Sequence, residues 1–213
     1  MSLTTTQHII LPEPTLRRLP WYLAYIETLM ARGEQHISST GISKALNVDS
    51  SQIAKDLSFL NIKGKTRIGY NVSELAEALS AFLGFKQAHK ACIFGTGSLG
   101  KALIRDKGLA NYGLQIVGAF DVNPRVVGSC IEDVLVSDLS EINKVFETFE
   151  PVVAIITVPP DVAQEVADTA IKAGFKAIWN FTPYRVKVPE NIVMANTSIY
   201  AHLALIYNRL KAN

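Results

Sequence analysis

Two different hydrophobic patterns divide the chain of 213 residues. Up to about residue 85, apolar residues recur at helical spacing in short segments. From Gln87 onward, compact apolar runs alternate with amphipathic segments, which is typical of a doubly wound parallel sheet covered by helices. The pattern predicts an α/β protein with a helical domain over 1–85, a sheet domain over 86–197 and a C-terminal helix over 198–213.

The first domain is predicted to hold a helix-turn-helix. We expect a first helix over 20–32, because Pro20 should interrupt any earlier turns. A second helix should be capped by Ser39 and end at Asn47, a residue that tolerates the left-handed conformation. Asp49 should then cap a third helix, and 73–82 should form a fourth. Two short helices joined by a tight turn form a helix-turn-helix pattern.

The third helix and the segment after it form a candidate DNA-binding surface. If Ile53, Leu57 and Leu60 are buried, the polar side chains of that helix face outward, where they can read bases. The segment 63–70 carries two glycines and three cations and predicts a β-hairpin, or wing, suited to phosphate contact. The alternative to DNA binding is that the third helix only presents an ordinary polar face to solvent. The candidate DNA contacts are Arg17, Arg18, Ser51, Gln52, Lys55, Ser58, Lys63, Lys65 and Arg67.

Apolar runs predict strands at 91–94, 114–120, 152–158, 177–181 and 192–195, with helices at 99–107, 139–149 and 162–173. The first strand leads into Gly95-Thr96-Gly97-Ser98-Leu99-Gly100, a G-x-G-x-x-G loop that opens a helix. In that context the first glycine permits the tight turn, the second lets the backbone approach a pyrophosphate, and the third lets the helix pack on the strand. The alternative is a tight turn without a ligand.

Other strand ends extend the candidate nucleotide site. Asp121 ends the next strand, where a carboxylate accepts hydrogen bonds from ribose hydroxyls and disfavours a 2′-phosphate. NAD(H) is therefore expected over NADP(H), although Arg125 argues weakly the other way. Two further loops follow strands at the sheet edge where ligands bind. The alternative is that their prolines only end the strands, as prolines in loops commonly do. The two loops are Val158-Pro159-Pro160 and Asn180-Phe181-Thr182-Pro183, and we expect them to line the nicotinamide half of the pocket.

Composition narrows the class of protein. The formal net charge is only +2, so DNA binding must depend on local clusters of cations. Cys92 and Cys130 are too few for a disulfide framework or a zinc site, and no metal is expected. No run of about 20 apolar residues and no signal peptide is apparent. We expect a cytoplasmic, soluble protein that binds no membrane.

No catalyst is apparent. None of His8, His36, His89 and His202 follows a predicted strand of the sheet, and no catalytic constellation is visible. This favours sensing over turnover, so we predict that the protein is not an enzyme. The alternative is an NAD-dependent oxidoreductase whose N-terminal helices only dimerise.

Taken together, the motifs resemble the Rex family of redox-sensing transcriptional repressors. The segments that carry the resemblance are 16–20, 22–23, 38–39, 52–58, 68–70, 95–100, 119–122, 158–159 and 180–183. The resemblance adds Ser38 and Tyr70 to the candidate DNA contacts and Val122 to the nucleotide site. It implies a homodimer that binds palindromic operator DNA when NADH is scarce and releases it when NADH binds, with NADH and NAD+ as effector ligands. It also implies that the C-terminal helix is exchanged between subunits.

The chain departs from the family pattern at several positions. Ala54 and Thr66-Arg67 replace residues typical of the recognition helix and the wing, so operator preference is expected to differ. Asp106 falls where some members place a Tyr near the nicotinamide. Ser198 falls where an Asp helps to link that pocket to the DNA-binding domain. We therefore expect the dinucleotide to bind but the NADH response to be altered or weakened; a DNA-binding regulator with altered NADH sensing is the remaining alternative.

Overall fold

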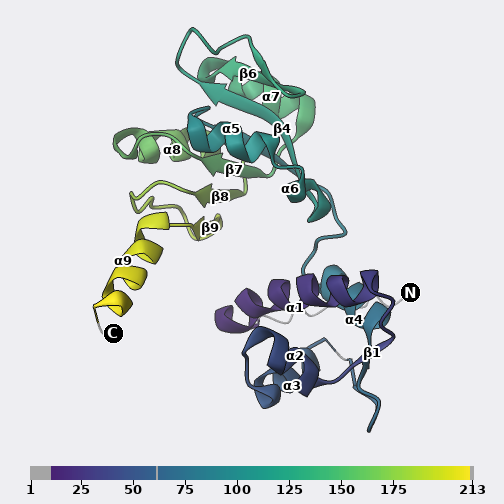
Figure 1. Ribbon diagram of the computed structural model, residues 1–213. Helices are drawn as coiled ribbons and strands as arrows, with labels where there is room; N and C mark the ends of the chain where they lie inside the picture. The colour runs from purple at the N-terminus through teal and green to yellow at the C-terminus, as the bar shows by residue number, and fades with distance from the viewer. Residues whose placement is uncertain (1–10, 61, 212–213) are drawn as a thin grey trace. The chain divides into compact units, whose positions relative to one another are not determined.

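The computed structural model describes residues 11–60 and 62–211 and divides into two compact units. The first unit extends through Lys86 and the second begins at Gln87 (Figure 1). Each unit has its own hydrophobic core, so each is described by itself.

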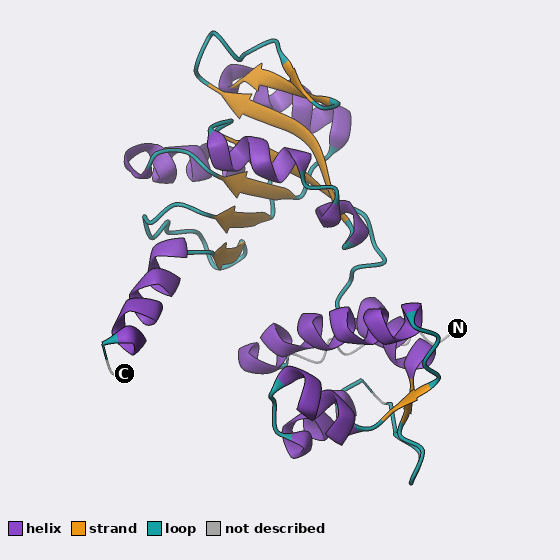
Figure 2. Cartoon of the chain, in the orientation of Figure 1, coloured by secondary structure: helices purple, strands orange, loops and turns teal. Residues whose placement is uncertain are grey.

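The first unit is mainly helical (Figure 2). Its buried core brings together apolar faces of all four helices. The elements are α1 (Glu13–Ala31), β1 (His36–Ile37), α2 (Ser39–Leu46), α3 (Ser50–Ser58), β2 (Tyr70–Asn71) and α4 (Val72–Phe82).

Helix α1 is longer than the sequence predicted. It runs without a break from Glu13 to Ala31, with Pro20 in its interior, so the prediction that Pro20 interrupts the helix is wrong. Leu19 and Leu23, on either side of the proline, are fully buried in the core. Their packing outweighs the single backbone hydrogen bond that a proline removes.

The helix-turn-helix is closed by side-chain caps. Ser38, rather than the predicted Ser39, caps α2, because its Oγ accepts from the Gly41 N–H at 3.0 Å. Asn47 ends α2 in the left-handed conformation (φ 53°), as predicted. Asp49 caps α3, also as predicted, and its Oδ1 accepts from the Ser51 N–H at 2.8 Å. Asn71 caps α4 in the same way, so this helix begins one residue before the predicted Ser73.

The wing is built differently from a simple hairpin. Its strand β2 pairs antiparallel with β1, which precedes α2 in the chain. The predicted hairpin segment itself is a tight turn, closed by two 2.8 Å backbone hydrogen bonds between Lys65 and Gly69. Gly69 has φ +92°, and a Cβ there would lie 2.4 Å from the Ile37 carbonyl oxygen. Glycine is therefore required where the wing meets β1.

The second unit is a seven-stranded sheet in the order β5-β6-β4-β3-β7-β8-β9, parallel except for the β5–β6 pair. Apolar side chains of α7 and α8 pack on one face and those of α5 on the other, which confirms the doubly wound fold. The chain order reverses between β3 and β7, the position where such sheets bind ligands. The elements are β3 (His89–Phe94), α5 (Ser98–Arg105), α6 (Gly108–Asn111), β4 (Leu114–Asp121), β5 (Cys130–Ile131), β6 (Val134–Asp138), η1 (Leu139–Glu141), α7 (Ile142–Phe149), β7 (Val153–Ile156), η2 (Pro160–Val162), α8 (Ala163–Ala173), β8 (Ala177–Asn180), β9 (Val193–Asn196) and α9 (Ile199–Leu210).

The sequence did not predict β5 and β6. Strand β5 has only two residues, and β6 alternates buried Val134 and Val136 with the exposed Leu135. This stretch is too short and too mixed to produce the continuous apolar run that marks the other strands.

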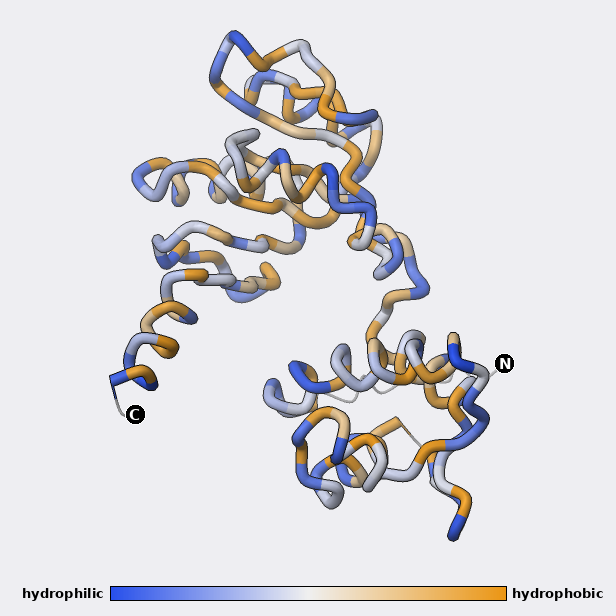
Figure 3. The backbone as a smooth tube through the Cα atoms, viewed as in Figure 1, coloured by the Kyte–Doolittle hydropathy of each residue, from blue (hydrophilic) through white to orange (hydrophobic). Residues whose placement is uncertain are grey.

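Helix α9 leaves its apolar side chains exposed. None of its described residues is buried, and both Tyr200 and Leu210 are more than 60% exposed. Apolar residues predominate along this helix and are interrupted by a few polar ones (Figure 3). Ser198 begins it by accepting from the Ala201 N–H at 3.1 Å.

Candidate nucleotide-binding site and DNA-binding surface

The three glycines of the loop after β3 have different surroundings. A Cβ at Gly95 (φ +94°) would lie 2.9 Å from the Thr157 carbonyl oxygen, and one at Gly100 only 2.1 Å from the Gly95 carbonyl oxygen. A Cβ at Gly97 would meet no described atom within 4 Å. The first and third glycines are therefore needed for packing, whereas the second leaves the backbone open to a ligand, as the motif predicted.

Asp121 holds this loop in place. Its Oδ2 accepts from the backbone N–H and the hydroxyl of Thr96, at 2.7 and 2.6 Å, and its Oδ1 accepts from the Asn123 N–H at 2.9 Å. Burial raises the pKa of Asp121, but these hydrogen bonds, led by the Thr96 hydroxyl, outweigh it and hold the pKa below its ordinary value of 3.8. The carboxylate is thus ionised at neutral pH and suited to accept hydrogen bonds from hydroxyls.

Thr157, at the end of β7, is a second support that the sequence analysis missed. Its hydroxyl lies 2.7 Å from the Gly95 carbonyl oxygen and 3.0 Å from that of Phe94. It thereby joins the glycine loop to β7 across the reversal of strand order. The only sequence signal for a role of Thr157 in the site was its position directly before the predicted Val158-Pro159.

A cavity of about 490 Å³ opens beside the loop at the carboxyl ends of the strands. Six of the predicted nucleotide-binding residues line it. Its walls are mostly apolar, and they also carry two carboxylates, Asp121 and Glu165. None of the described residues that line it is Lys, Arg or His. Its size and its apolar walls suit a nucleotide base. The lining residues are Phe94, Gly95, Gly97, Phe120, Asp121, Val122, Leu139, Thr157, Val158, Pro159, Val162, Glu165 and Val166.

The remaining predicted nucleotide-binding residues lie outside this lining. Thr96 is buried against Asp121, Gly100 packs under the loop, and Ser98 and Leu99 form the first turn of α5. Phe181, Thr182 and Pro183 follow β8 and do not line the cavity.

The loop after β8 depends on Asn180, the first residue of the predicted loop and fully buried. Its Nδ2 donates to the Tyr184 carbonyl oxygen at 2.7 Å and to Asn196 Oδ1 at 3.0 Å. Its Oδ1 accepts from the Thr182 N–H at 2.9 Å. Phe181 packs against Trp179, with ring centroids 4.7 Å apart.

Asp106 and Ser198, the two departures from the family pattern, have local contacts. Asp106 ends α5, and its Oδ1 accepts from the Gly108 N–H at 2.8 Å, at the start of α6. Ser198 caps α9. Neither residue lines the cavity.

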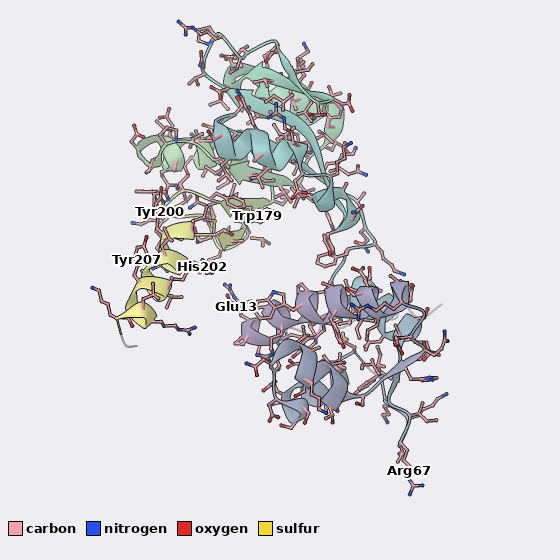
Figure 4. The ribbon with its side chains drawn as sticks, viewed as in Figure 1. Glu13, Arg67, Trp179, Tyr200, His202 and Tyr207 are labelled. Atoms are coloured by element: carbon pink, nitrogen blue, oxygen red, sulfur yellow. The ribbon has the colours of Figure 1, made fainter. Side chains whose placement is uncertain are left out.

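The cations of the wing and of α3 are exposed. Lys63, Lys65 and Arg67 all lie on the surface of the wing, and Arg67 extends away from the unit at its tip (Figure 4). Lys55 and Ser58 are exposed on α3. This surface can contact the phosphate backbone without rearrangement of the core.

Other predicted DNA contacts already have partners within the chain. Arg17 forms an exposed ion pair with Glu13 at 2.7 Å, a contact that contributes little to stability. The Ser51 hydroxyl donates to Asp49, and Ser38 caps α2. Tyr70 is half-buried at the base of the wing, where burial raises its pKa.

Arg18 and Gln52, two further predicted DNA contacts, are partly buried and also have partners within the chain. Both donate to Asp56, a fully buried carboxylate on α3 that the sequence analysis did not consider. The Arg18–Asp56 pair has an N–O distance of 2.7 Å. The sequence could have indicated the contact between Gln52 and Asp56, because they are four residues apart and so share a helix face.

Two further features concern metals and membranes. Within residues 11–60 and 62–211, no three His, Cys, Asp or Glu side chains are grouped so that they could hold a metal ion. In the same ranges, no helix has the length and hydropathy needed to cross a bilayer.

Two protein-family models match the chain: "CoA binding domain" over residues 86–184 and "Putative DNA-binding protein N-terminus" over residues 10–58. The chain is 52% identical to the redox-sensing transcriptional repressor Rex of Bacteroides fragilis over 202 residues, covering 95% of this chain and 92% of that protein. It is 49% identical to the Rex repressor of Porphyromonas gingivalis over 201 residues, covering 94% and 92%.

Solved structures lead to the same family. The structure of RSP in complex with β-NAD+ and operator DNA matches with a TM-score of 0.91 at 35% identity, covering 95% of this chain and 94% of that one. RSP in complex with β-NADH matches with a TM-score of 0.86 at 35% identity, covering 95% of both chains. RSP is described as a Rex-family repressor. This chain therefore belongs to the Rex family of redox-sensing transcriptional repressors.

Proposed function

We propose that this chain represses transcription by binding operator DNA and releases that DNA when NADH binds, so that it responds to the ratio of NADH to NAD+. The observation that carries the proposal is the presence in one chain of two sites. One is a glycine loop fixed by Asp121 beside a cavity, and the other is an exposed cationic wing next to a capped helix-turn-helix. The proposed DNA-binding domain is 1–85, the proposed NAD(H)-binding domain is 86–197, and both act in the cytoplasm.

The nucleotide site favours NAD(H) over NADP(H). Two carboxylates, Asp121 and Glu165, line the cavity, whereas Arg125 is exposed outside its lining. A 2′-phosphate beside an ionised Asp121 would be repelled, with no cation of the described lining to offset the charge. The relatives that the chain matches are named transcriptional repressors, which supports a sensor over a dehydrogenase.

DNA binding would use the exposed residues of α3 and the wing. Lys55 can donate to guanine in the major groove, and Lys63, Lys65 and Arg67 can contact phosphates. Ser58 lies beside Lys55 on the same exposed face of α3.

The protein is proposed to act as a homodimer. The exposed apolar side chains of α9 form a face that a second copy can cover, and exchange of this helix between subunits would bury it. A homodimer would also match the two-fold symmetry of a palindromic operator. Because Asp106 and Ser198 are committed to local contacts, the response to NADH is proposed to be weakened.

Selection from a random DNA library tests the proposal without a known operator. Purified full-length protein is incubated with random duplexes, and bound DNA is sequenced after selection without nucleotide, with NAD+ and with NADH. The proposal predicts recovery of a palindromic motif that is depleted by NADH but not by NAD+. Recovery of no motif under any of the three conditions would contradict it.

A further inference from the structure

The buried carboxylate of Asp56 joins α1 to α3. We propose that Asp56 is a positioning residue for base recognition: it fixes the side-chain amide of Gln52, so that Gln52 presents its donor and acceptor to DNA in one order. This inference rests on the proposed DNA-binding function of α3.

Asp56 is saturated with donors from two helices. Its Oδ1 accepts from Thr15 Oγ1 at 3.1 Å, from Arg18 Nη2 at 2.9 Å and from Gln52 Nε2 at 2.8 Å. Its Oδ2 accepts from Arg18 Nε and Tyr22 OH, at 2.7 and 2.8 Å. Three of these partners lie at positions 15, 18 and 22 on one face of α1, so the carboxylate locks that helix to α3.

The charge state of Asp56 determines which group of the Gln52 amide faces it. Burial raises the pKa of Asp56, but the hydrogen bonds from Arg18, Tyr22, Gln52 and Thr15 outweigh it and hold the pKa below its ordinary value. An ionised carboxylate only accepts hydrogen bonds. The amide of Gln52 must therefore turn its NH2 group, and not its carbonyl oxygen, toward Asp56.

The fixed amide has a consequence at the DNA surface. Gln52 is partly buried, and one N–H and the Oε1 atom are left over from the contact with Asp56. Glutamine recognises adenine when Oε1 accepts from N6–H and Nε2 donates to N7. A side chain held in one orientation pays less entropy on binding and does not present the reversed order to another base.

A purely structural role for Asp56 predicts something different. If Asp56 only holds α1 against α3, every loss of a hydrogen bond to it should lower stability and should lower the affinity for all DNA sequences alike. If Asp56 acts through Gln52, only the loss of the Gln52 contact should change which base is preferred.

The test compares base preferences of five variants of the full-length protein by selection from a random duplex library at fixed salt. Gln52→Ala removes the contact, Asp56→Asn removes the charge that fixes its direction because an Asn amide can either donate or accept, and the double variant combines them. Thr15→Val and Tyr22→Phe are matched controls, because each removes another hydrogen bond to the same carboxylate. Thermal unfolding of each variant is measured in parallel.

We expect Gln52→Ala to lose roughly tenfold preference for one base at one symmetric pair of motif positions. Asp56→Asn should lose the same preference, and the double variant should lose no more. Thr15→Val and Tyr22→Phe should unfold at lower temperature but keep the preference. Retention of the preference in Asp56→Asn, or its equal loss in both controls, would overturn the inference. Selection of no motif by the wild-type protein would instead contradict the proposed function.

A second measurement covers the case in which Asp56→Asn does not fold. Hydrogen exchange of the side-chain amide of Gln52 is followed by NMR in the wild-type protein without DNA, with the exposed Gln115 as reference. A hydrogen bond to Asp56 predicts exchange at least several-fold slower for Gln52 than for Gln115. Equal exchange rates would overturn the inference.

Discussion

The backbone N–H and the hydroxyl of Thr96 both donate to a single oxygen of Asp121, at 2.7 and 2.6 Å. This contact joins the glycine loop after β3 to the end of β4 and fixes both sides of the nucleotide cavity. We therefore propose two functions for this acidic residue of the fingerprint. It shapes the loop that is proposed to receive the pyrophosphate, and its Oδ1 is proposed to accept from a ribose hydroxyl as well.

Replacement of Asp121 by Asn should weaken NADH binding about tenfold, because a neutral amide cannot accept from Thr96 and from a ribose hydroxyl as strongly as a carboxylate. The same change should narrow the preference for NADH over NADPH, since repulsion of the 2′-phosphate is removed. Calorimetric titration with both nucleotides measures the two effects. Asp161→Asn, an exposed carboxylate outside the cavity lining, is the matched control. Unchanged NADH affinity in Asp121→Asn would show that the site is elsewhere.

Two glycine substitutions should separate ligand binding from folding. Gly97→Ala meets no described atom within 4 Å, so its melting temperature should equal that of the wild type while NADH affinity falls at least tenfold. Gly100→Ala places a Cβ 2.1 Å from the Gly95 carbonyl oxygen and should cost about 1–3 kcal/mol of stability. Differential scanning calorimetry and NADH titration are compared for both. Normal NADH binding by Gly97→Ala would contradict the proposed approach of the pyrophosphate.

The wing cations should act as phosphate contacts. Lys65→Gln and Arg67→Gln should each weaken binding to all DNA sequences by a similar factor and reduce the slope of log K against log salt by about 1 per subunit. Affinities for a selected duplex and for random duplex are measured across a salt series. Lys172→Gln, exposed on α8, serves as control and should leave the slope unchanged. A change in base preference with an unchanged slope would mean that the wing reads bases instead.

The Asp56 cluster should make the first unit sensitive to acid. Its folded pKa lies below the ordinary value of 3.8, so its stabilisation is complete above that pH and is lost as the pH falls through the folded pKa. The difference in free energy of unfolding between wild type and Asp56→Asn should therefore shrink below about pH 3.8. Urea titrations followed by the methyl NMR signals of Ile26 and Ile53 report on this unit specifically. A difference that stays constant down to the lowest pH at which the protein remains folded would contradict a depressed pKa.

The parts of the fold that the sequence predicted are those set by local rules. The glycine loop, the cap at Asp49 and the left-handed Asn47 each depend on a few neighbouring residues, and all three were confirmed. Continuous apolar runs likewise marked five of the parallel strands. Local chemistry of this kind can be read without knowledge of the tertiary contacts.

The failures involve contacts between distant segments. The ion pair of Arg18 was not foreseen because its partner, Asp56, lies 38 residues further along the chain, on α3. Pro20 looked like a helix breaker because the packing that compensates for it is tertiary. Strand β5 was missed for a different reason, since its two residues are too few to show an alternation or an apolar run. Charge and propensity alone cannot show which polar side chain will be buried with a partner.

The central claim is that NADH lowers the affinity of this protein for its operator. Fluorescence anisotropy of a labelled palindromic duplex recovered by selection is measured at fixed salt without nucleotide, with NAD+ and with NADH. The account predicts specific binding that NADH weakens and NAD+ does not, by a modest factor because Asp106 and Ser198 make local contacts instead. The same affinity under all three conditions would contradict redox sensing, and release of the DNA by both nucleotides would contradict discrimination between them.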